Sequence, residues 1–196
     1  MGRFHAGRRI GNRPESLPNW RVSTTTPEIA AAVSHLLGGT SADDCVDEVV
    51  TGSPAVRIVL DGACSVTTEM RLWGPKGVVH HCDGALFLSP AKVRGNPCGC
   101  PASSEERAAL AKALKAPQPT TTVTFRLAER YGLGRFEFSS PSRMLADEAC
   151  EIRARLSALT GEVLCELALE LVTVTVAGGA EVSFRKPTLK IIKPWH

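Results

Sequence analysis

The chain has 196 residues, of which 43% are hydrophobic and 22% are charged, and its formal net charge is +3. This length and balance are typical of a globular protein with a sizeable core, and they exclude a disordered chain. The small positive charge excludes a protein that neutralises many phosphates along a nucleic acid, because that role needs a dense basic face. No apolar run approaches the roughly 20 residues of a membrane span, so we expect no membrane segment.

The first 18 residues are rich in Gly, Arg and Pro and show little apolar periodicity. We therefore expect residues 1–18 to form an extended Arg-rich arm that becomes ordered only where it docks. Four arginines lie in this arm: Arg3, Arg8, Arg9 and Arg13. We expect direct contact with DNA to be weak or absent and to be confined to this arm.

Residues 19–76 are predicted to form a first α+β half. Its helix begins at Thr26-Pro27-Glu28, because threonine is a good N-cap, proline suits the first turn, and an acid is favoured at the positive end of a helix. Gly38-Gly39 ends the helix by supplying the left-handed C-cap conformation. Alternation predicts strands at 19–24, 55–60 and 64–73, the last two forming a hairpin.

Residues 77–117 are predicted to be an insertion that contains cysteines, histidines and a short helix at 103–115. His80, His81 and Cys82 precede Cys98-Gly99-Cys100-Pro101, and the segment between them is rich in Gly, Pro and small side chains. Thiolate and imidazole are the ligands that structural zinc prefers. We therefore expect a zinc ion to close this loop, with its ligands drawn from Cys82, Cys98, Cys100, His80 and His81.

Two other interpretations of these residues remain open at this point. The three cysteines would also suit ordinary buried thiols, with the histidines on the surface or bonded to backbone carbonyls. A disulfide from Cys82 to Cys98 or Cys100 is the other alternative, but the odd number of cysteines and the lack of a signal-peptide pattern favour reduced thiols in the cytoplasm.

Residues 118–196 are predicted to form a second α+β half. Its helix at 144–159 follows Ser140-Pro141, which repeats the cap-plus-proline start of the first half. The predicted strands lie at 120–127, 135–140, 163–176 and 180–193, the last two forming a long antiparallel hairpin. The fold class is therefore α+β, with antiparallel sheets and a few helices. The repeated order of strand, helix and hairpin suggests a pseudo-duplicated β-α-β-β unit, the alternative being two ordinary α+β segments.

Catalytic motifs are sparse, and we expect that the protein is not an enzyme. Gly132 and Gly134 belong to no phosphate-binding loop, because no G-x-x-x-x-G-K-[ST] is present. A zinc deaminase would need H-x-E with C-x-x-C, and neither occurs around His80. A cysteine nucleophile needs a histidine and an orienting acid that converge in space, whereas His80 to Asp83 are sequence neighbours.

An ordered set of short motifs runs along the chain from about residue 8 to 193. Its most specific part is Cys82-Asp83-Gly84, then Cys98-Gly99-Cys100-Pro101, then the strand that follows Gly132-Leu133-Gly134. The other segments of the set are Arg9-Ile10-Gly11, Arg13-Pro14, Trp20-Arg21-Val22-Ser23-Thr24, Thr26-Pro27, Pro119-Thr120-Thr121-Thr122, Val123–Leu127 and Arg135-Phe136-Glu137-Phe138-Ser139-Ser140. In order and spacing this set resembles the recombination directionality factors of actinobacterial phages and their relatives.

This resemblance implies a protein that binds a large serine integrase on its attachment-site DNA, in the cytoplasm of the bacterial host, and switches it from integration to excision. The family pattern places a further cysteine about four residues before the Cys-Asp-Gly, where this chain has Val78. His80 or His81 would then be the fourth ligand, unless Cys64 or Cys45 completes the site.

Exposed tips and arms suit partner binding, so we expect the integrase to contact Arg13 and the loop tip Leu86-Phe87-Leu88. The alternative for the three tip residues is a strand inside the core. The alternative for the whole protein is a small zinc-stabilised nucleic-acid-binding or regulatory module that uses the N-terminal arm.

Overall fold

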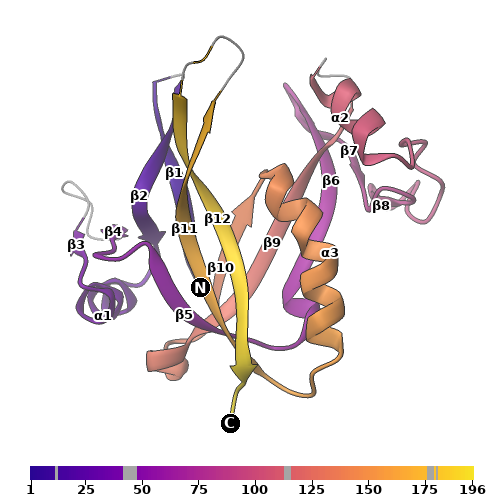
Figure 1. The fold of residues 1–196 in the computed structure, drawn as a ribbon. Helices are drawn as coiled ribbons and strands as arrows, with labels where there is room; N and C mark the ends of the chain where they lie inside the picture. Colours follow the sequence, from indigo (N-terminus) through magenta and orange to yellow (C-terminus); the bar gives the residue numbers. More distant parts are fainter. Residues whose placement is uncertain (12, 42–47, 113–115, 176–178, 180) are drawn as a thin grey trace. The chain divides into compact units, whose positions relative to one another are not determined.

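The computed structural model describes residues 1–196 except 12, 42–47, 113–115, 176–178 and 180 (Figure 1). Contacts divide the chain into two compact units, each assembled from separate stretches of sequence. Unit 1 comprises Met1–Val66, Thr122–Ser140 and Cys150–His196, and unit 2 comprises Thr67–Thr121 and Pro141–Ala149. The units therefore differ from the predicted segments 19–76, 77–117 and 118–196, because contacts rather than chain order define them.

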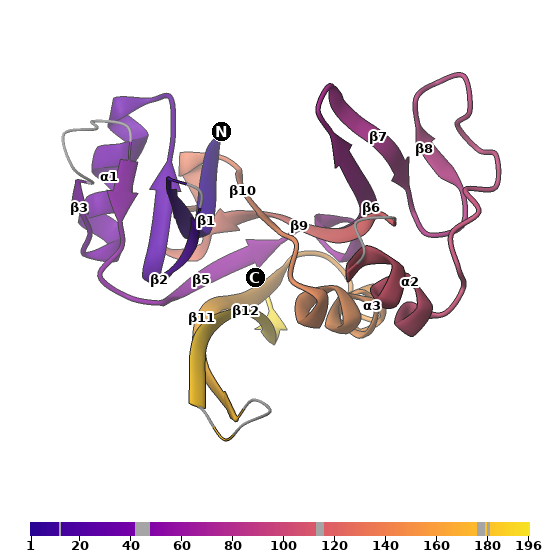
Figure 2. The same ribbon diagram turned by 90° about the horizontal axis from the view of Figure 1, so that it is seen from above.

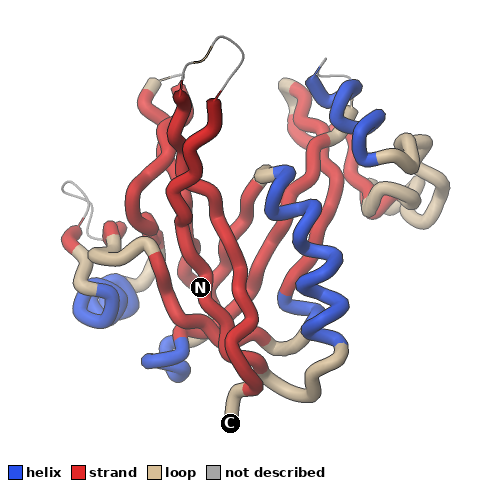
Figure 3. The backbone as a smooth tube through the Cα atoms, in the orientation of Figure 1, coloured by secondary structure: helices blue, strands red, loops and turns tan. Residues whose placement is uncertain are grey.

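The fold combines many strands with a few helices, as predicted for the α+β class (Figure 3). The helices are α1 (Pro27–Leu37), α2 (Ser104–Lys112) and α3 (Arg143–Ser157), with 3-10 turns η1 (Ala63–Ser65) and η2 (Ala128–Leu133). The strands are β1 (Gly2–Ile10), β2 (Arg13–Ser23), β3 (Thr40–Ser41), β4 (Glu48–Val50), β5 (Ala55–Leu60), β6 (Val66–Gly74), β7 (Gly77–Cys82), β8 (Phe87–Ser89), β9 (Gln118–Leu127), β10 (Phe136–Ser140), β11 (Val163–Thr175) and β12 (Glu181–Pro194). Among the described helices, none combines the length and the apolar character needed to cross a membrane.

The sheet of unit 1 has the strand order β12-β11-β5-β9-β10-β1-β2-β4-β3. β1 lies inside this sheet, antiparallel to β2 and parallel to β10, with Gly2 opposite Phe136 and Phe4 opposite Phe138. Residues 1–18, predicted as an extended arm, are thus β1 and the start of β2. β2 follows β1 directly in the chain, but β10 is distant in the sequence, so composition alone did not show that β1 lies inside the sheet with Phe4 buried.

Aromatic side chains form the centre of the core in unit 1. Trp20 is completely buried, and its ring meets Phe4 and Phe138 edge to face at centroid distances of 5.8 and 5.0 Å. Its indole N–H donates a hydrogen bond of 2.8 Å to the Pro54 carbonyl, so the one polar group of the side chain has a partner. This packing fixes β2 against the segment that leads into β5.

The predicted start and end of α1 are confirmed. Pro27 takes the first helical position and Gly38 adopts φ +64 at the C-cap, where the N–H of Gly39 bonds to the Ser34 carbonyl. Thr26 stands at the N-cap, but its side chain makes no capping hydrogen bond.

One predicted hairpin is confirmed and the other is wrong. β11 and β12 pair along their length, as the alternation predicted. β5 pairs with β11 and β9, whereas β6 pairs with β7 and β9, so residues 55–60 and 64–73 are not hairpin partners. Gly62 at φ +71 and the η1 turn that follows it separate the two strands. The two halves of the chain therefore differ in strand pairing.

Unit 2 contains β6, β7 and β8 as an antiparallel ribbon, which Figure 2 shows side by side. Met70 on β6 lies opposite Cys82 on β7, and Cys82 lies opposite Phe87 on β8. Its small apolar cluster joins Met70, Cys82 and Cys98, with Phe87 and Cys100 packed against them. Three of these five side chains are cysteines, so the cluster is poor in hydrocarbon.

Candidate metal centre

Two of the predicted ligands lie on one face of β7. Side chains two residues apart in a strand point to the same side of the sheet, so His80 and Cys82 share a face while His81 points to the other. β6 pairs with β7 at Leu72 and Met70, which holds both positions in register.

The other two ligands return on the loop that follows β8. The Cys98 N–H donates a 2.8 Å hydrogen bond to the Ala85 carbonyl, and the Phe87 N–H donates a 2.9 Å hydrogen bond to the Asn96 carbonyl. Gly99 adopts φ +73, a conformation that other residues rarely take, and so turns the backbone between Cys98 and Cys100. These contacts bring the loop back over β7.

The start of the loop is held by Asp83, directly after Cys82. Its carboxylate accepts hydrogen bonds of 2.8 and 2.7 Å from the N–H groups of Ala85 and Leu86. These backbone hydrogen bonds lower the pKa of Asp83, because they stabilise its ionised form. Gly84, at φ +101, makes the tight turn between them.

The ligand atoms of His80, Cys82, Cys98 and Cys100 all lie within 4.8 Å of one another. His80 Nε2 lies 3.2 Å from Cys82 Sγ and 3.5 Å from Cys100 Sγ, and the two sulfurs are 3.7 Å apart. Around tetrahedral zinc, with bonds of about 2.3 Å to sulfur and about 2.0–2.1 Å to nitrogen, the edges are about 3.8 Å between sulfurs and about 3.6 Å between sulfur and nitrogen. The four side chains therefore fit a tetrahedral metal ion.

Burial raises the pKa of the Cys82 thiol to about 12. Burial likewise raises the pKa of Cys100, with a further contribution from its hydrogen bond to Cys98. Burial also opposes ionisation of Cys98, but hydrogen bonds from the Cys100 backbone and from the neighbouring thiols outweigh it and lower the Cys98 pKa. Three thiols this close resist joint ionisation unless a cation lies among them, and a bound metal supplies that charge.

His81 is outside the cluster. Its Nδ1 lies 2.9 Å from Ser89 Oγ on β8, and its Nε2 lies 2.9 Å from Glu69 Oε2 on β6. Both ring nitrogens are thus engaged on the face of β7 opposite to Cys82, and Glu69 also binds Arg71. The His81 ring ties three strands together and leaves the fourth ligand position to His80.

The other cysteines weighed for the fourth position do not join the cluster. Cys64 is exposed, and its thiol donates to the Asp61 carbonyl in unit 1. Cys45 lies outside the described residues. Arg107 on α2 donates to the carbonyls of Pro101 and Ala102, and so holds the helix to the end of the metal loop.

The predicted partner-binding residues differ in environment. Leu86 is 41% exposed, whereas Leu88 is half-buried. Phe87 is half-buried against the cysteine cluster, with its ring centroid 4.7 Å from that of His80. Only Leu86 of the three keeps a large free apolar surface. Arg13 begins β2, and its side chain lies outside the described part of the chain.

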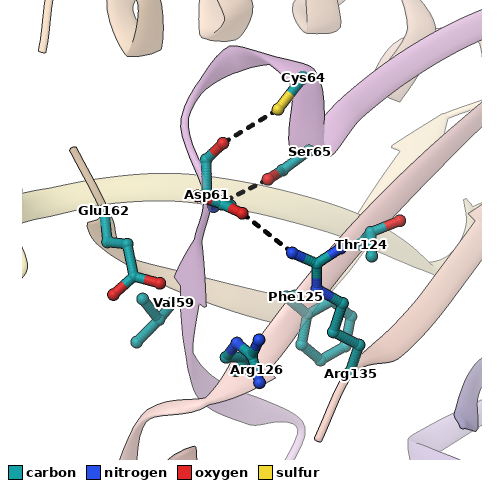
Figure 4. Close-up of a pocket in the computed structure, with 9 residues that line it drawn as sticks. All are labelled: Val59, Asp61, Cys64, Ser65, Thr124, Phe125, Arg126, Arg135 and Glu162. Atoms are coloured by element: carbon teal, nitrogen blue, oxygen red, sulfur yellow. Dashed lines mark hydrogen bonds and ion pairs between the residues drawn. The ribbon is translucent and has the colours of Figure 1, made fainter. Parts of the chain in front are cut away.

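A pocket of about 150 Å³ lies within unit 1 (Figure 4). Its charged groups are already occupied: Arg135 forms a 3.0 Å ion pair with Asp61, and Glu162 accepts a hydrogen bond from Tyr131. Ser65 Oγ accepts a 2.8 Å hydrogen bond from the Asp61 N–H. Pockets for small-molecule ligands usually measure about 300–1,000 Å³. This pocket is smaller, and its charged side chains already have partners, including Arg126, whose guanidinium lies 4.8 Å from the Tyr131 ring centroid.

Comparison with known proteins gives one family for nearly the whole chain. A family model described as "Gp3-like: Recombination directionality factor-like" matches residues 1–191. The match includes both units and all four residues of the cysteine and histidine cluster. No solved structure matches the chain.

Proposed function

From the premise that this chain belongs to the Gp3-like, recombination directionality factor-like family, we propose that it binds a serine integrase and switches it from integration to excision. The match over residues 1–191 is the observation that carries this proposal. The protein acts in the cytoplasm of the bacterial host by binding, and it catalyses no step itself. Its direct contacts with DNA are weak or absent, in keeping with a net charge of only +3.

A binding protein changes the direction of a reaction only through differential affinity. It must bind the integrase arrangement that joins attL and attR more tightly than the arrangement that joins attP and attB, since equal affinity shifts nothing. A coupling of about 1–3 kcal/mol per bound copy is typical of such effects. Several copies on one synaptic complex multiply that bias, so each interface need not be strong.

The metal cluster has a structural role in this proposal. His80, Cys82, Cys98 and Cys100 would hold zinc with all four positions filled by protein, which leaves no open position for a substrate. Such an ion would join β7 to the loop that returns after β8. Because the surrounding apolar cluster is small, metal binding would contribute directly to the folding of unit 2.

Recombination of attL with attR tests the proposal. The probe is the purified serine integrase encoded nearest this gene, with its own attachment-site DNA, assayed with and without this protein. We expect attL × attR product only when the protein is present, and reduced attP × attB product. An integrase that is active on attP × attB but gives no attL × attR product with the folded protein would refute the proposal.

The same reactions separate the proposal from its alternative. A nucleic-acid-binding module would bind the attachment-site DNA without integrase, with an affinity that falls steeply as salt rises. We expect little binding to naked DNA and clear retention once integrase is bound. Retention that does not depend on integrase would favour the alternative.

A further inference from the structure

Among the described residues of unit 2, the two most exposed large apolar side chains lie at the turn between β6 and β7: Trp73 is 66% exposed and Val79 is 62% exposed. Val78, beside them, is 42% exposed. Trp73 lies opposite Val78 in the strand register, and a bulge next to Trp73 leaves Val79 without a ladder partner. We call residues 73–79 the hairpin knob.

Such exposure calls for an explanation, because Trp is a large residue that folded proteins mostly bury. The indole N–H of Trp73 makes no hydrogen bond within the described chain. The exposed ring therefore combines an apolar surface with a free hydrogen-bond donor. An amphipathic ring of this kind is enriched at the energetic centres of protein interfaces.

The knob carries positive charge and no acid. Lys76, at the turn, is exposed and is its one charged residue. The nearest acid before it, Glu69, is engaged by Arg71 and His81. A two-fold contact between two knobs would bring two Lys76 side chains together, which disfavours a second copy as the partner. A protruding cationic apolar tip is complementary to an apolar recess edged by carboxylates.

The metal cluster lies directly next to the knob in the chain. Val79 precedes His80, and the ladder that pairs Trp73 with Val78 continues to Leu72 opposite His80 and Met70 opposite Cys82. A metal bound to His80 and Cys82 would therefore fix the part of β7 that directly follows the knob. A rigid knob loses less conformational entropy on docking, so the metal would favour binding without touching the partner.

We infer that the hairpin knob is the anchor through which this protein docks into an apolar, acid-edged recess on the integrase. The inference rests on the proposed function and adds the contact surface to it. It shifts the main anchor from the Leu86-Phe87-Leu88 tip to Trp73, because Phe87 is packed on the cluster whereas Trp73 is free.

Binding of the neighbouring integrase on attL DNA, measured by biolayer interferometry, tests the inference. Trp73→Ala should weaken binding by at least about 30-fold. Leu171→Ala is the matched control, because Leu171 is 61% exposed but lies on β11 of unit 1, and it should change binding by less than about 2-fold. Lys76→Glu gives a second variant at an exposed turn, and it should both weaken binding and reduce its dependence on salt.

Metal content and thermal unfolding of the Trp73 and Lys76 variants should equal those of the unchanged protein, since both side chains are exposed. Integrase binding that both variants retain would overturn the inference and leave the proposed function standing. Equal losses in Trp73→Ala and Leu171→Ala would also overturn it, because the effect would then not be specific to the knob.

Two further outcomes are decisive. Unchanged protein that binds no integrase would overturn the proposed function together with the inference. Loss of binding to phosphatidylglycerol vesicles in Trp73→Ala, with integrase binding intact, would replace the protein recess by a lipid surface and so overturn the inference alone.

Discussion

Substitution of the two adjacent histidines separates a metal ligand from its neighbour. His80→Ala removes an imidazole that lies 3.2 Å from Cys82 Sγ, inside the cluster. His81→Ala removes a ring that binds Glu69 and Ser89 on the opposite face of β7. The two variants lose the same atoms from neighbouring positions, so each is a control for the other.

The expected difference follows from the number of ligands. Structural zinc binds zinc-finger peptides with about 10–16 kcal/mol at neutral pH. Shared among four ligands, this is about 2.5–4 kcal/mol each, or a loss of about 100- to 1,000-fold in zinc affinity for His80→Ala. His81→Ala removes only side-chain contacts that join β7 to its neighbouring strands, so it should change zinc affinity by less than about 10-fold.

Competition with a chromophoric chelator gives the two affinities, and mass spectrometry of the dialysed proteins gives the zinc content. We expect one zinc ion in the unchanged protein and in His81→Ala, and less than one in His80→Ala. Equal zinc affinity in the two variants would refute the assignment of His80. Loss of zinc affinity in His81→Ala alone would mean that His81, and not His80, is the ligand on β7.

Three other substitutions test the packing. Phe87→Asp should cost about 3 kcal/mol or more and lower the zinc content, because Phe87 packs on the metal cluster; unchanged thermal unfolding and zinc content would contradict this. Trp20→Phe should cost about 1–3 kcal/mol through the unpaired Pro54 carbonyl alone, as measured by urea unfolding, and a cost below about 0.5 kcal/mol would show that this hydrogen bond does not matter. Burial raises the pKa of Cys165 to about 12, so its thiol stays neutral when folded but ionises near pH 9 when unfolded. The free energy of unfolding should therefore fall between about pH 9 and 12 by up to about 1.4 kcal/mol per pH unit more than in Cys165→Ala, and parallel pH curves for the two proteins would contradict the raised pKa.

Local signals predicted α1, the second half of β2 and the strands β5, β6, β9, β10, β11 and β12, but they missed β1, β3, β4, β7 and β8. The ends of α1 depend on Pro27 and Gly38, whose backbone preferences act within one turn, so the sequence alone placed them. The pairing of β5 could not be predicted in this way. Alternation shows that residues 55–60 form a strand, but the choice of β11 over β6 depends on long-range packing.

The sequence predicted a zinc site and three of its cysteine ligands, but it did not identify the fourth ligand. Residue type and loop composition pointed to Cys82, Cys98 and Cys100, while the choice between His80 and His81 stayed open. Strand alternation would have favoured His80, since residues two apart share a face, once 77–82 was recognised as a strand. Trp73 was missed because an aromatic residue in an alternating run predicts burial, and only the register shows that it lies at the turn.

The parallel pairing of β1 with β10 also affects how the protein is made. Phe4 emerges from the ribosome long before its partner Phe138, about 130 residues later in the chain. At about 5–20 residues per second, translation leaves the first strand without that partner for roughly 7–27 s. During this interval the apolar side of β1 is available to chaperones or to aggregation. Gly2 is buried against the Phe136 ring, so any larger side chain at position 2 would crowd the pairing of β1 with β10.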